Sequence, residues 1–201
     1  QEPPPSLQYL LEAAERVESG LPIPDRLSDI FIAGTGLGGM RPKVSIRDSE
    51  HLLWLAKFPS LSDNLIDIPL IEHATLRLAA LAGLNVPENK AIEVLDKNVM
   101  LIRRFDRSWS MTNKPMELRH HMVSALTLLA CEELDSPNKS YMDIVSAMRR
   151  YCGTNFLKAD IAELYGRMVF NILVSNDDDH LRNHAFLWDT TSGGWKLSPL
   201  Y

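Results

Sequence analysis

The sequence has few of the features that would place a protein in a membrane, on nucleic acid or in a secretory pathway. Its longest apolar run, residues 76–84, is interrupted by Arg77 and is too short to span a bilayer. A net charge of −5 over 201 residues gives no support for a nucleic-acid-binding surface. Residues 1–6 are polar and rich in proline, unlike a secretory signal. We therefore expect a cytoplasmic protein that makes no contact with a membrane.

Cysteine is also scarce. Only Cys131 and Cys152 are present, far apart and without His or Cys neighbours at the spacing of a metal site. This pattern favours two free thiols in a reducing compartment, with a single disulfide as the alternative. The remaining composition, 45% hydrophobic and 23% charged, is ordinary for a globular protein. The length suits one large domain or two small lobes.

The most informative segment is the polar stretch from Asn176 to His184, which contains three acids, two amides and two imidazoles. It follows the apolar run Met168–Val174, which we expect to be buried. A dense polar cluster after a buried element is typical of a catalytic loop. Asp178 and Asn183 have the Asp-x-x-x-x-Asn spacing of a kinase catalytic loop. In such a loop the Asp orients the substrate hydroxyl and the Asn binds magnesium.

Three interpretations of this stretch compete. His180 and His184, with the carboxylates, could bind a transition metal, although no His-Glu-x-x-His pattern is present. The stretch could instead be a solvated acidic turn. In the third interpretation, phosphoryl transfer, His180 replaces the usual kinase lysine and braces the loop. Magnesium, Lys57 or Arg182 would then offset the charge of the transferred phosphoryl group.

A glycine-rich segment precedes the candidate lysine. Residues 30–33 and 44–46 are expected strands on either side of residues 34–43. Backbone amides of such a hairpin can approach phosphates closely because glycine has no side chain to block them. The relevant glycines are Gly34, Gly36, Gly38 and Gly39. The segment matches neither a Walker A loop nor a Rossmann fingerprint, and a plain flexible turn is the alternative.

Lys57 lies near the end of a third expected strand, residues 51–59. Lysine after a glycine-rich hairpin grips phosphates in kinases, although an isolated strand lysine usually just reaches solvent. The next element is an expected helix over residues 70–82, with Ile71, Leu78 and Leu81 on its apolar face. Glu72 falls in its first turn, where an acid is favourable, and is the candidate partner of Lys57.

Periodicity suggests the remaining elements. We expect a helix over residues 7–18, followed by a proline-rich linker, and two strands over 91–95 and 99–105 around a turn at 96–98. From residue 105 onward we expect helices, marked by 118–129, by a capping box at Ser140 and Asp143, and by 161–172. A β-hairpin over residues 185–197 follows the polar stretch.

With these residues in place, the chain resembles the HipA family of bacterial serine/threonine kinases, the toxins of HipBA-type toxin–antitoxin pairs. The most specific match is the polar stretch 176–184. Together the matches run in family order from about residue 30 to the end. The other matching segments are 32–34 with 38–43, 56–59, 72–79, 104–107, 124–128 and 197–201.

The resemblance implies an α+β, two-lobed protein-kinase-like fold. Residues 1–24 would form a helix and linker, 25–104 a small β-rich N-lobe with one helix, and 105–201 a helical C-lobe. Relative to the family, the chain is expected to be truncated at both ends. It lacks an amino-terminal β-rich subdomain and the metal-binding Asp expected directly after residues 198–201.

The resemblance also implies phosphorylation of a protein serine or threonine with ATP and Mg²⁺. Lys57, paired with Glu72, would bind the ATP phosphates, and the backbone from Arg103 to Phe105 would face the adenine. Asp106 would lie near the ribose, Asp178 and His180 would act in catalysis, and Asn183 would bind magnesium.

The implied partners are a protein substrate, such as an aminoacyl-tRNA synthetase, and a helix-turn-helix antitoxin that supplies the DNA contact; the biological outcome would be persistence. Phe31 stands where several members autophosphorylate a serine, and Thr35 is the nearest hydroxyl in the loop. A competing hypothesis is a non-catalytic nucleotide-binding or antitoxin-binding module, which the missing metal-binding Asp favours.

Overall fold

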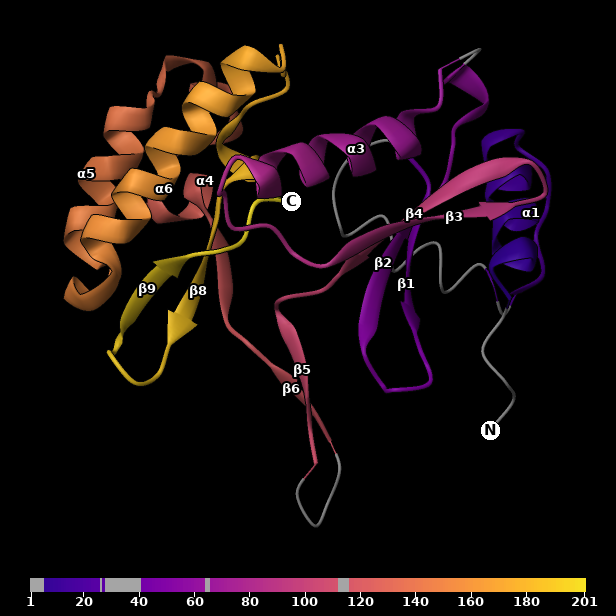
Figure 1. The fold of residues 1–201 in the computed structure, drawn as a ribbon, viewed down its shortest axis with the longest axis horizontal. Coiled ribbons are helices and arrows are strands. Elements are labelled where there is room, and N and C mark those ends of the chain that lie inside the picture. Colours follow the sequence, from indigo (N-terminus) through magenta and orange to yellow (C-terminus); the bar gives the residue numbers. More distant parts are fainter. Residues whose placement is uncertain (1–5, 26, 28–40, 64–65, 112–115) are drawn as a thin grey trace. The chain divides into compact units, whose positions relative to one another are not determined.

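The computed structural model forms two compact units (Figure 1). The first unit contains residues 1–77 and 88–104, and the second contains 78–87 and 105–201. The structure describes residues 6–25, 27, 41–63, 66–111 and 116–201. The expected strand at 30–33 and the glycine-rich residues Gly34, Gly36, Gly38 and Gly39 lie outside the described residues, as do Phe31 and Thr35. No helix within these ranges is both long and apolar enough to cross a membrane.

The first unit is built on an antiparallel sheet of strand order β1-β2-β4-β3. Its strands are β1 (Lys43–Arg47), β2 (Leu53–Lys57), β3 (Asn89–Val94) and β4 (Lys97–Arg103). The β1–β2 turn is held by the Asp48 carboxylate, which accepts hydrogen bonds from the Leu52 amide and the Trp54 indole. The β3–β4 turn is one residue earlier than expected, because Leu95 and Asp96 adopt the positive φ of a two-residue hairpin turn.

Helix α1 (Leu7–Glu18) confirms the expected amphipathic helix. Its apolar face contributes Leu10, Leu11 and Ala14 to a core shared with Trp54 on β2 and with Phe58, the residue that follows β2. The Ser6 side chain caps the helix by accepting a hydrogen bond from the Tyr9 amide. The helix and the strands therefore bury a single hydrophobic core.

Helix α3 (Ile68–Leu81) is present, but the apolar face expected for it is wrong. Leu76 and Ala79 are buried, whereas Ile71 and Leu78 are 51% and 52% exposed. The helix is apolar nearly all round, so periodicity could not identify its buried face. Glu72 is not in the first turn, because the helix begins at Ile68. It lies instead on the same face as Leu76 and Ala79, four and seven residues further along.

The second unit combines two small sheets with helices. Its strands are β5 (Arg107–Ser110), β6 (Met116–Arg119), β7 (Met122–Ser124), β8 (Ala185–Asp189) and β9 (Gly194–Leu197). Its helices are α4 (Ala125–Leu128), α5 (Tyr141–Tyr151) and α6 (Thr154–Leu173), with 3-10 turns η2 (Glu133–Asn138) and η3 (Leu181–Asn183). A 3-10 turn η1 (Leu61–Asp63) belongs to the first unit.

The expectation of helices throughout residues 105–184 is wrong. Leu118 lies on β6 and pairs with Ser108, and Met122 lies on β7 and pairs with Leu187. Only α4 is helical within the expected helix 118–129. Strand β7 forms by pairing with a segment more than sixty residues later, a non-local contact that local spacing does not reveal.

Helices α5 and α6 and the β8–β9 hairpin, which lie side by side in Figure 1, enclose the second core. The hairpin expected over residues 185–197 is confirmed. Leu164 and Phe186 are buried within the core. The run Met168–Val174 is only partly buried, contrary to expectation, because Ile172 and Leu173 are 70% and 77% exposed at the end of α6.

The capping box at the start of α5 confirms the expected helix start. The Ser140 side chain accepts a hydrogen bond from the Asp143 amide, and the Asp143 carboxylate accepts one from the Ser140 amide. Both bonds add to the backbone bonds of the first helical turn, where the Asp143 amide also donates to the Ser140 carbonyl at 3.0 Å.

We predict that Ser140→Ala lowers the free energy of unfolding by about 1 kcal/mol, because it removes this cap. Urea unfolding followed by circular dichroism measures the change. Ser146→Ala is the matched control, since the Ser146 hydroxyl donates only to the Met142 carbonyl within the same helix. Equal losses in the two variants would contradict a specific role for the cap.

Candidate functional site

Lys57 and Glu72 form an ion pair in the first unit, as the sequence suggested. The Lys57 Nζ atom lies 2.7 Å from Glu72 Oε2, and the two side chains are 25% and 33% exposed. Lys57 ends β2, and Glu72 lies on the inward-facing side of α3. The carboxylate thus holds the ammonium group in a defined position that solvent can still reach.

Lys43 is a neighbour of this pair that the sequence reasoning missed as a site residue. It lies opposite Lys57 in the antiparallel register of β1 and β2. Burial and the charge of Lys57 lower the pKa of the Lys43 ammonium, partly opposed by Glu72. Like charges across a strand pair are unfavourable, so a phosphate anion beside these lysines would relieve their repulsion. The register of a hairpin whose turn is 48–52 could have identified Lys43.

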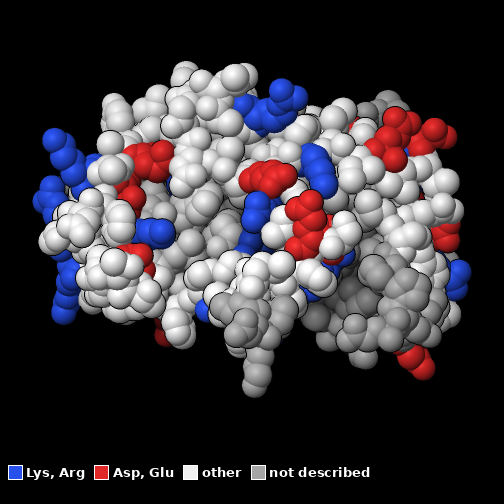
Figure 2. Space-filling model, turned by 60° about the horizontal axis from the view of Figure 1, so that its bottom comes forward, with Lys and Arg blue, Asp and Glu red and all other residues white. Residues whose placement is uncertain are grey.

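The positive charge of Lys43 and Lys57 is a local feature of the surface. On the face shown in Figure 2, basic and acidic side chains are interspersed, in keeping with the net charge of −5. A large basic field of the kind that binds nucleic acid is not visible on that face.

The residues expected around the adenine and ribose belong to two different units. In the first unit, the Arg103 amide donates to the Glu88 carbonyl at 2.8 Å. In the second, the Phe105 ring packs against Tyr201 with centroids 5.3 Å apart. Asp106 is only 7% exposed, and its carboxylate accepts a hydrogen bond from Arg107 at 2.5 Å. A ribose contact by Asp106 would therefore compete with this internal ion pair.

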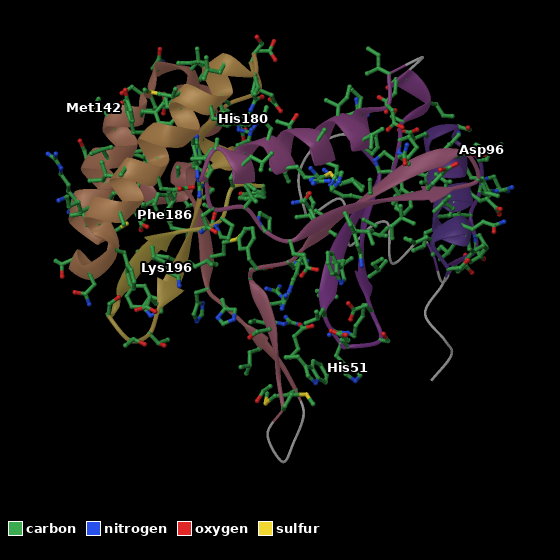
Figure 3. The ribbon with its side chains drawn as sticks, viewed as in Figure 1. His51, Asp96, Met142, His180, Phe186 and Lys196 are labelled. Atoms are coloured by element: carbon green, nitrogen blue, oxygen red, sulfur yellow. The ribbon has the colours of Figure 1, made fainter. Side chains whose placement is uncertain are left out.

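The polar stretch 176–184 forms an ordered loop between α6 and β8 (Figure 3). The Asn183 side-chain amide donates to the Asp178 carbonyl, and Asn176 Oδ1 accepts from the Asp178 amide at 3.3 Å. The Asp178 carboxylate itself is 84% exposed, with His180 Nε2 at 3.5 Å. These bonds fix the backbone of Asp178 on both sides while its carboxylate faces solvent.

Asp179, the next residue, points the opposite way into the second unit. Its Oδ1 atom lies 2.9 Å from His184 Nε2, and its Oδ2 atom accepts a hydrogen bond from the Tyr141 hydroxyl. The His184 side chain is 3% exposed, and the Asp179 side chain 15%. His184 Nδ1 is buried with no partner among the described residues. The loop is thereby attached to α5 and to the start of β8.

Electrostatics favour the charged form of this buried carboxylate. Burial raises the pKa of Asp179, but hydrogen bonds from His184 and Tyr141 outweigh it and bring the pKa below its usual value. Burial, followed by the bond to Asp179, raises the pKa of the Tyr141 hydroxyl. The sequence reasoning missed Asp179 and Tyr141, because nothing in three adjacent acids indicates which one faces inward.

The ion-pair partner of Arg182 is Glu133, not Asp178. Its guanidinium binds Glu133 on η2, with Nε 2.8 Å from both carboxylate oxygens. Both side chains are more than half exposed, so the pair is a surface contact of modest energy. In this arrangement Arg182 is engaged elsewhere than at a transferred phosphoryl group.

The described residues give no support to a transition-metal site. Among them, no three His, Cys, Asp or Glu side chains gather in a group able to hold a metal. His184 is buried against Asp179, and His180 is 45% exposed, so the two rings occupy different environments. Magnesium is a different case, because it prefers oxygen ligands and keeps several waters or phosphate oxygens. The Asn183 amide oxygen suits it chemically.

We predict that Asp179→Asn lowers the free energy of unfolding by roughly 1–3 kcal/mol at neutral pH, because a buried hydrogen-bonded charge is lost. The folded pKa lies below the unfolded value of about 3.9, so this contribution is complete above that value. It disappears as pH falls through the folded pKa, and the two unfolding curves should converge in acid.

Urea unfolding at neutral pH and in acid measures this difference. Asp177→Asn is the control, since Asp177 is exposed on the same loop. A loss for Asp179→Asn that does not change with pH would exclude an ionised, buried carboxylate.

Comparison with known proteins gives consistent results. Residues 35–201 match the family model described as the HipA-like C-terminal domain. A putative kinase of Haemophilus influenzae is 27% identical over 190 residues, covering 84% of this chain and 52% of the relative. The putative kinase Y4dM of Sinorhizobium fredii is 25% identical over 162 residues, covering 74% of this chain and 36% of the relative.

Two solved structures share the fold. HipA of Shewanella oneidensis, solved with HipB and operator DNA, matches with a TM-score of 0.64 and 19% identity. That match covers 82% of this chain and 42% of HipA. The Helicobacter pylori proinflammatory kinase CtkA matches with a TM-score of 0.58 and 21% identity, covering 79% of this chain and 53% of CtkA. The chain thus spans about half or less of the length of these relatives.

Proposed function

The chain belongs to the family of HipA-like C-terminal domains, and from this premise we propose that it transfers the γ-phosphate of ATP to a serine or threonine hydroxyl of a protein. The observation that carries the proposal is the loop around Asp178. Its backbone is held by Asn176 and Asn183, while its carboxylate is 84% exposed. An exposed carboxylate on a fixed backbone can receive a proton from an incoming hydroxyl.

Each named residue has a separate role in this proposal. Asp178 orients the hydroxyl and takes its proton, and His180, 3.5 Å from that carboxylate, steadies it. The Asn183 side-chain oxygen would ligate magnesium. When bound, Mg-ATP supplies the phosphoryl group and a cation that offsets its charge. Lys57, positioned by Glu72, would bind the phosphates, with Lys43 beside it.

The remaining ATP contacts are proposed from the family resemblance. The glycines Gly34, Gly36, Gly38 and Gly39 would place backbone amides over the phosphates. The backbone from Arg103 to Phe105 would face the adenine, and Asp106 would lie toward the ribose.

The partners are likewise proposed from the family resemblance. HipA of Shewanella oneidensis was solved with HipB and its operator DNA. We propose a helix-turn-helix antitoxin as partner of this chain too, with DNA contacted through the antitoxin, in the cytoplasm. An aminoacyl-tRNA synthetase is the proposed class of protein substrate, and translation arrest leading to persistence is the proposed outcome.

A second candidate is a non-catalytic nucleotide-binding or antitoxin-binding module. The engagement of Arg182 by Glu133, rather than by a group at the Asp178 carboxylate, favours it. The two candidates differ in one outcome, since the module binds ATP without transferring phosphate.

We predict that Asp178→Asn lowers the rate of phosphate transfer by roughly 10²–10⁴-fold, because it removes the general base. ATP affinity should stay within about threefold, since an exposed carboxylate adds little to nucleotide binding. Transfer of labelled phosphate and calorimetric titration with ATP measure the two quantities. Asp177→Asn serves as the matched control, and an equal loss of transfer in that variant would remove Asp178 from the mechanism.

We predict that Lys57→Met weakens ATP binding by about tenfold or more, because a charge-assisted bond to phosphate is lost. Lys90→Met is the control, since the Lys90 ammonium lies 4.2 Å over the Trp54 ring. Trp54 lies on the opposite face of β2 from Lys57. Unchanged ATP affinity in Lys57→Met would show that the phosphates bind elsewhere.

A further inference from the structure

A pocket of about 270 Å³ lies beside the catalytic loop, within the second unit. One side is formed by the loop, including His180 and Leu181, and the other by the segment that leads into α5, including Lys139 and Tyr141. Figure 3 labels His180 on the first segment and Met142 at the start of α5 beside the second. The pocket therefore adjoins the residues proposed to carry out the chemistry.

Two of the buried side chains that line the pocket are apolar. Ile144 and Leu181 are 2% and 5% exposed, and both line it. Two polar groups of the lining are already engaged, because the Tyr141 hydroxyl and His184 Nε2 both bind the Asp179 carboxylate, whereas His184 Nδ1 has no partner among the described residues. A bound side chain would therefore meet apolar surface within the pocket, which suits an aliphatic stem.

The rim carries available positive charge. Lys139 is exposed, and no hydrogen bond or ion pair of its ammonium group occurs within the part of the chain that the structure describes. Hydrogen bonds from the Ser140 hydroxyl and amide lower the pKa of the nearby Asp143, and the charge of Lys139 adds to this effect. Among the described residues that line the pocket, Asp179 is the one acid, and its two carboxylate oxygens are bound by His184 and Tyr141 rather than by Lys139. An acidic group at the rim would thus gain a cationic partner without displacing an existing ion pair.

We propose that this pocket is a specificity subsite for an acidic side chain of the protein substrate, close in sequence to the phosphorylated residue. The inference rests on the proposed kinase function and adds the substrate class to it. A glutamate suits the pocket best, since its stem would lie on Ile144 and Leu181 and its carboxylate would reach Lys139. His180 both lines the pocket and lies 3.5 Å from the Asp178 carboxylate. An extended peptide advances about 3.3 Å per residue, so the two positions would be separated by only a few residues.

The test uses fluorescently labelled peptides with one central serine. Glutamate is placed at each flanking position in turn and compared there with glutamine, leucine and lysine. Peptide binding is measured by fluorescence anisotropy, and phosphate transfer from labelled ATP is measured separately. We expect glutamate to bind roughly three- to tenfold more tightly than glutamine at one or two positions, as for a partly exposed ion pair.

Reversing the charge of Lys139, and separately that of a control lysine, tests whether Lys139 causes the preference for glutamate. Lys139→Glu should abolish the preference for glutamate and favour lysine at the same position. Lys158→Glu, at an exposed site on α6, makes the same change in net charge and should leave the preference intact. Urea unfolding curves verify that both variants are folded.

The outcomes separate this inference from the proposed function. A glutamate preference that Lys139→Glu reverses, without any phosphate transfer, would support the subsite and count against the kinase. Transfer without a glutamate preference would overturn the subsite alone. A preference for leucine, or an equal response of the two charge-reversal variants, would also overturn it, and so would absence of binding by every peptide.

Discussion

Asp178 and Asp179 are adjacent in the sequence, yet their carboxylates lie in opposite environments. The Asp179 carboxylate is 15% exposed and bound by His184 and Tyr141, whereas the Asp178 carboxylate is 84% exposed. Breaking a buried, hydrogen-bonded charge of this kind is costly, so the loop has little freedom to turn over. The buried acid thereby determines where the exposed acid stands, and the proposed chemistry depends on that position.

In the first unit, too, charged side chains hold one another in place, but there the excess charge is positive. Two lysines, Lys43 and Lys57, lie opposite each other on neighbouring strands, and the carboxylate of Glu72 binds one of them. Both lysines are only partly buried, so solvent reduces the cost of this uneven charge balance. An arrangement that is mildly unfavourable alone becomes favourable beside an anion, which is the property that a phosphate site requires.

Local features of the structure followed from the sequence, whereas most of the non-local ones did not. The helix at 7–18, the capping box at Ser140 and the hairpin at 185–197 depend on neighbouring residues and are confirmed. The Lys57–Glu72 pair was suggested by the order of elements. The predictions of a helix at Met122 and of the buried face of α3 were wrong, because residues distant in the sequence determine both. The contact between Asp179 and Tyr141 likewise joins segments that no local pattern connects.

Mass spectrometry of protein incubated with Mg-ATP, alone and with candidate aminoacyl-tRNA synthetases, tests the central claim most directly. We predict a stable phosphate on a serine or threonine hydroxyl, derived from the γ position of ATP. Release of inorganic phosphate without any phosphorylated protein would indicate a hydrolase and contradict the account. Binding of ATP with neither product would identify a nucleotide-binding module instead.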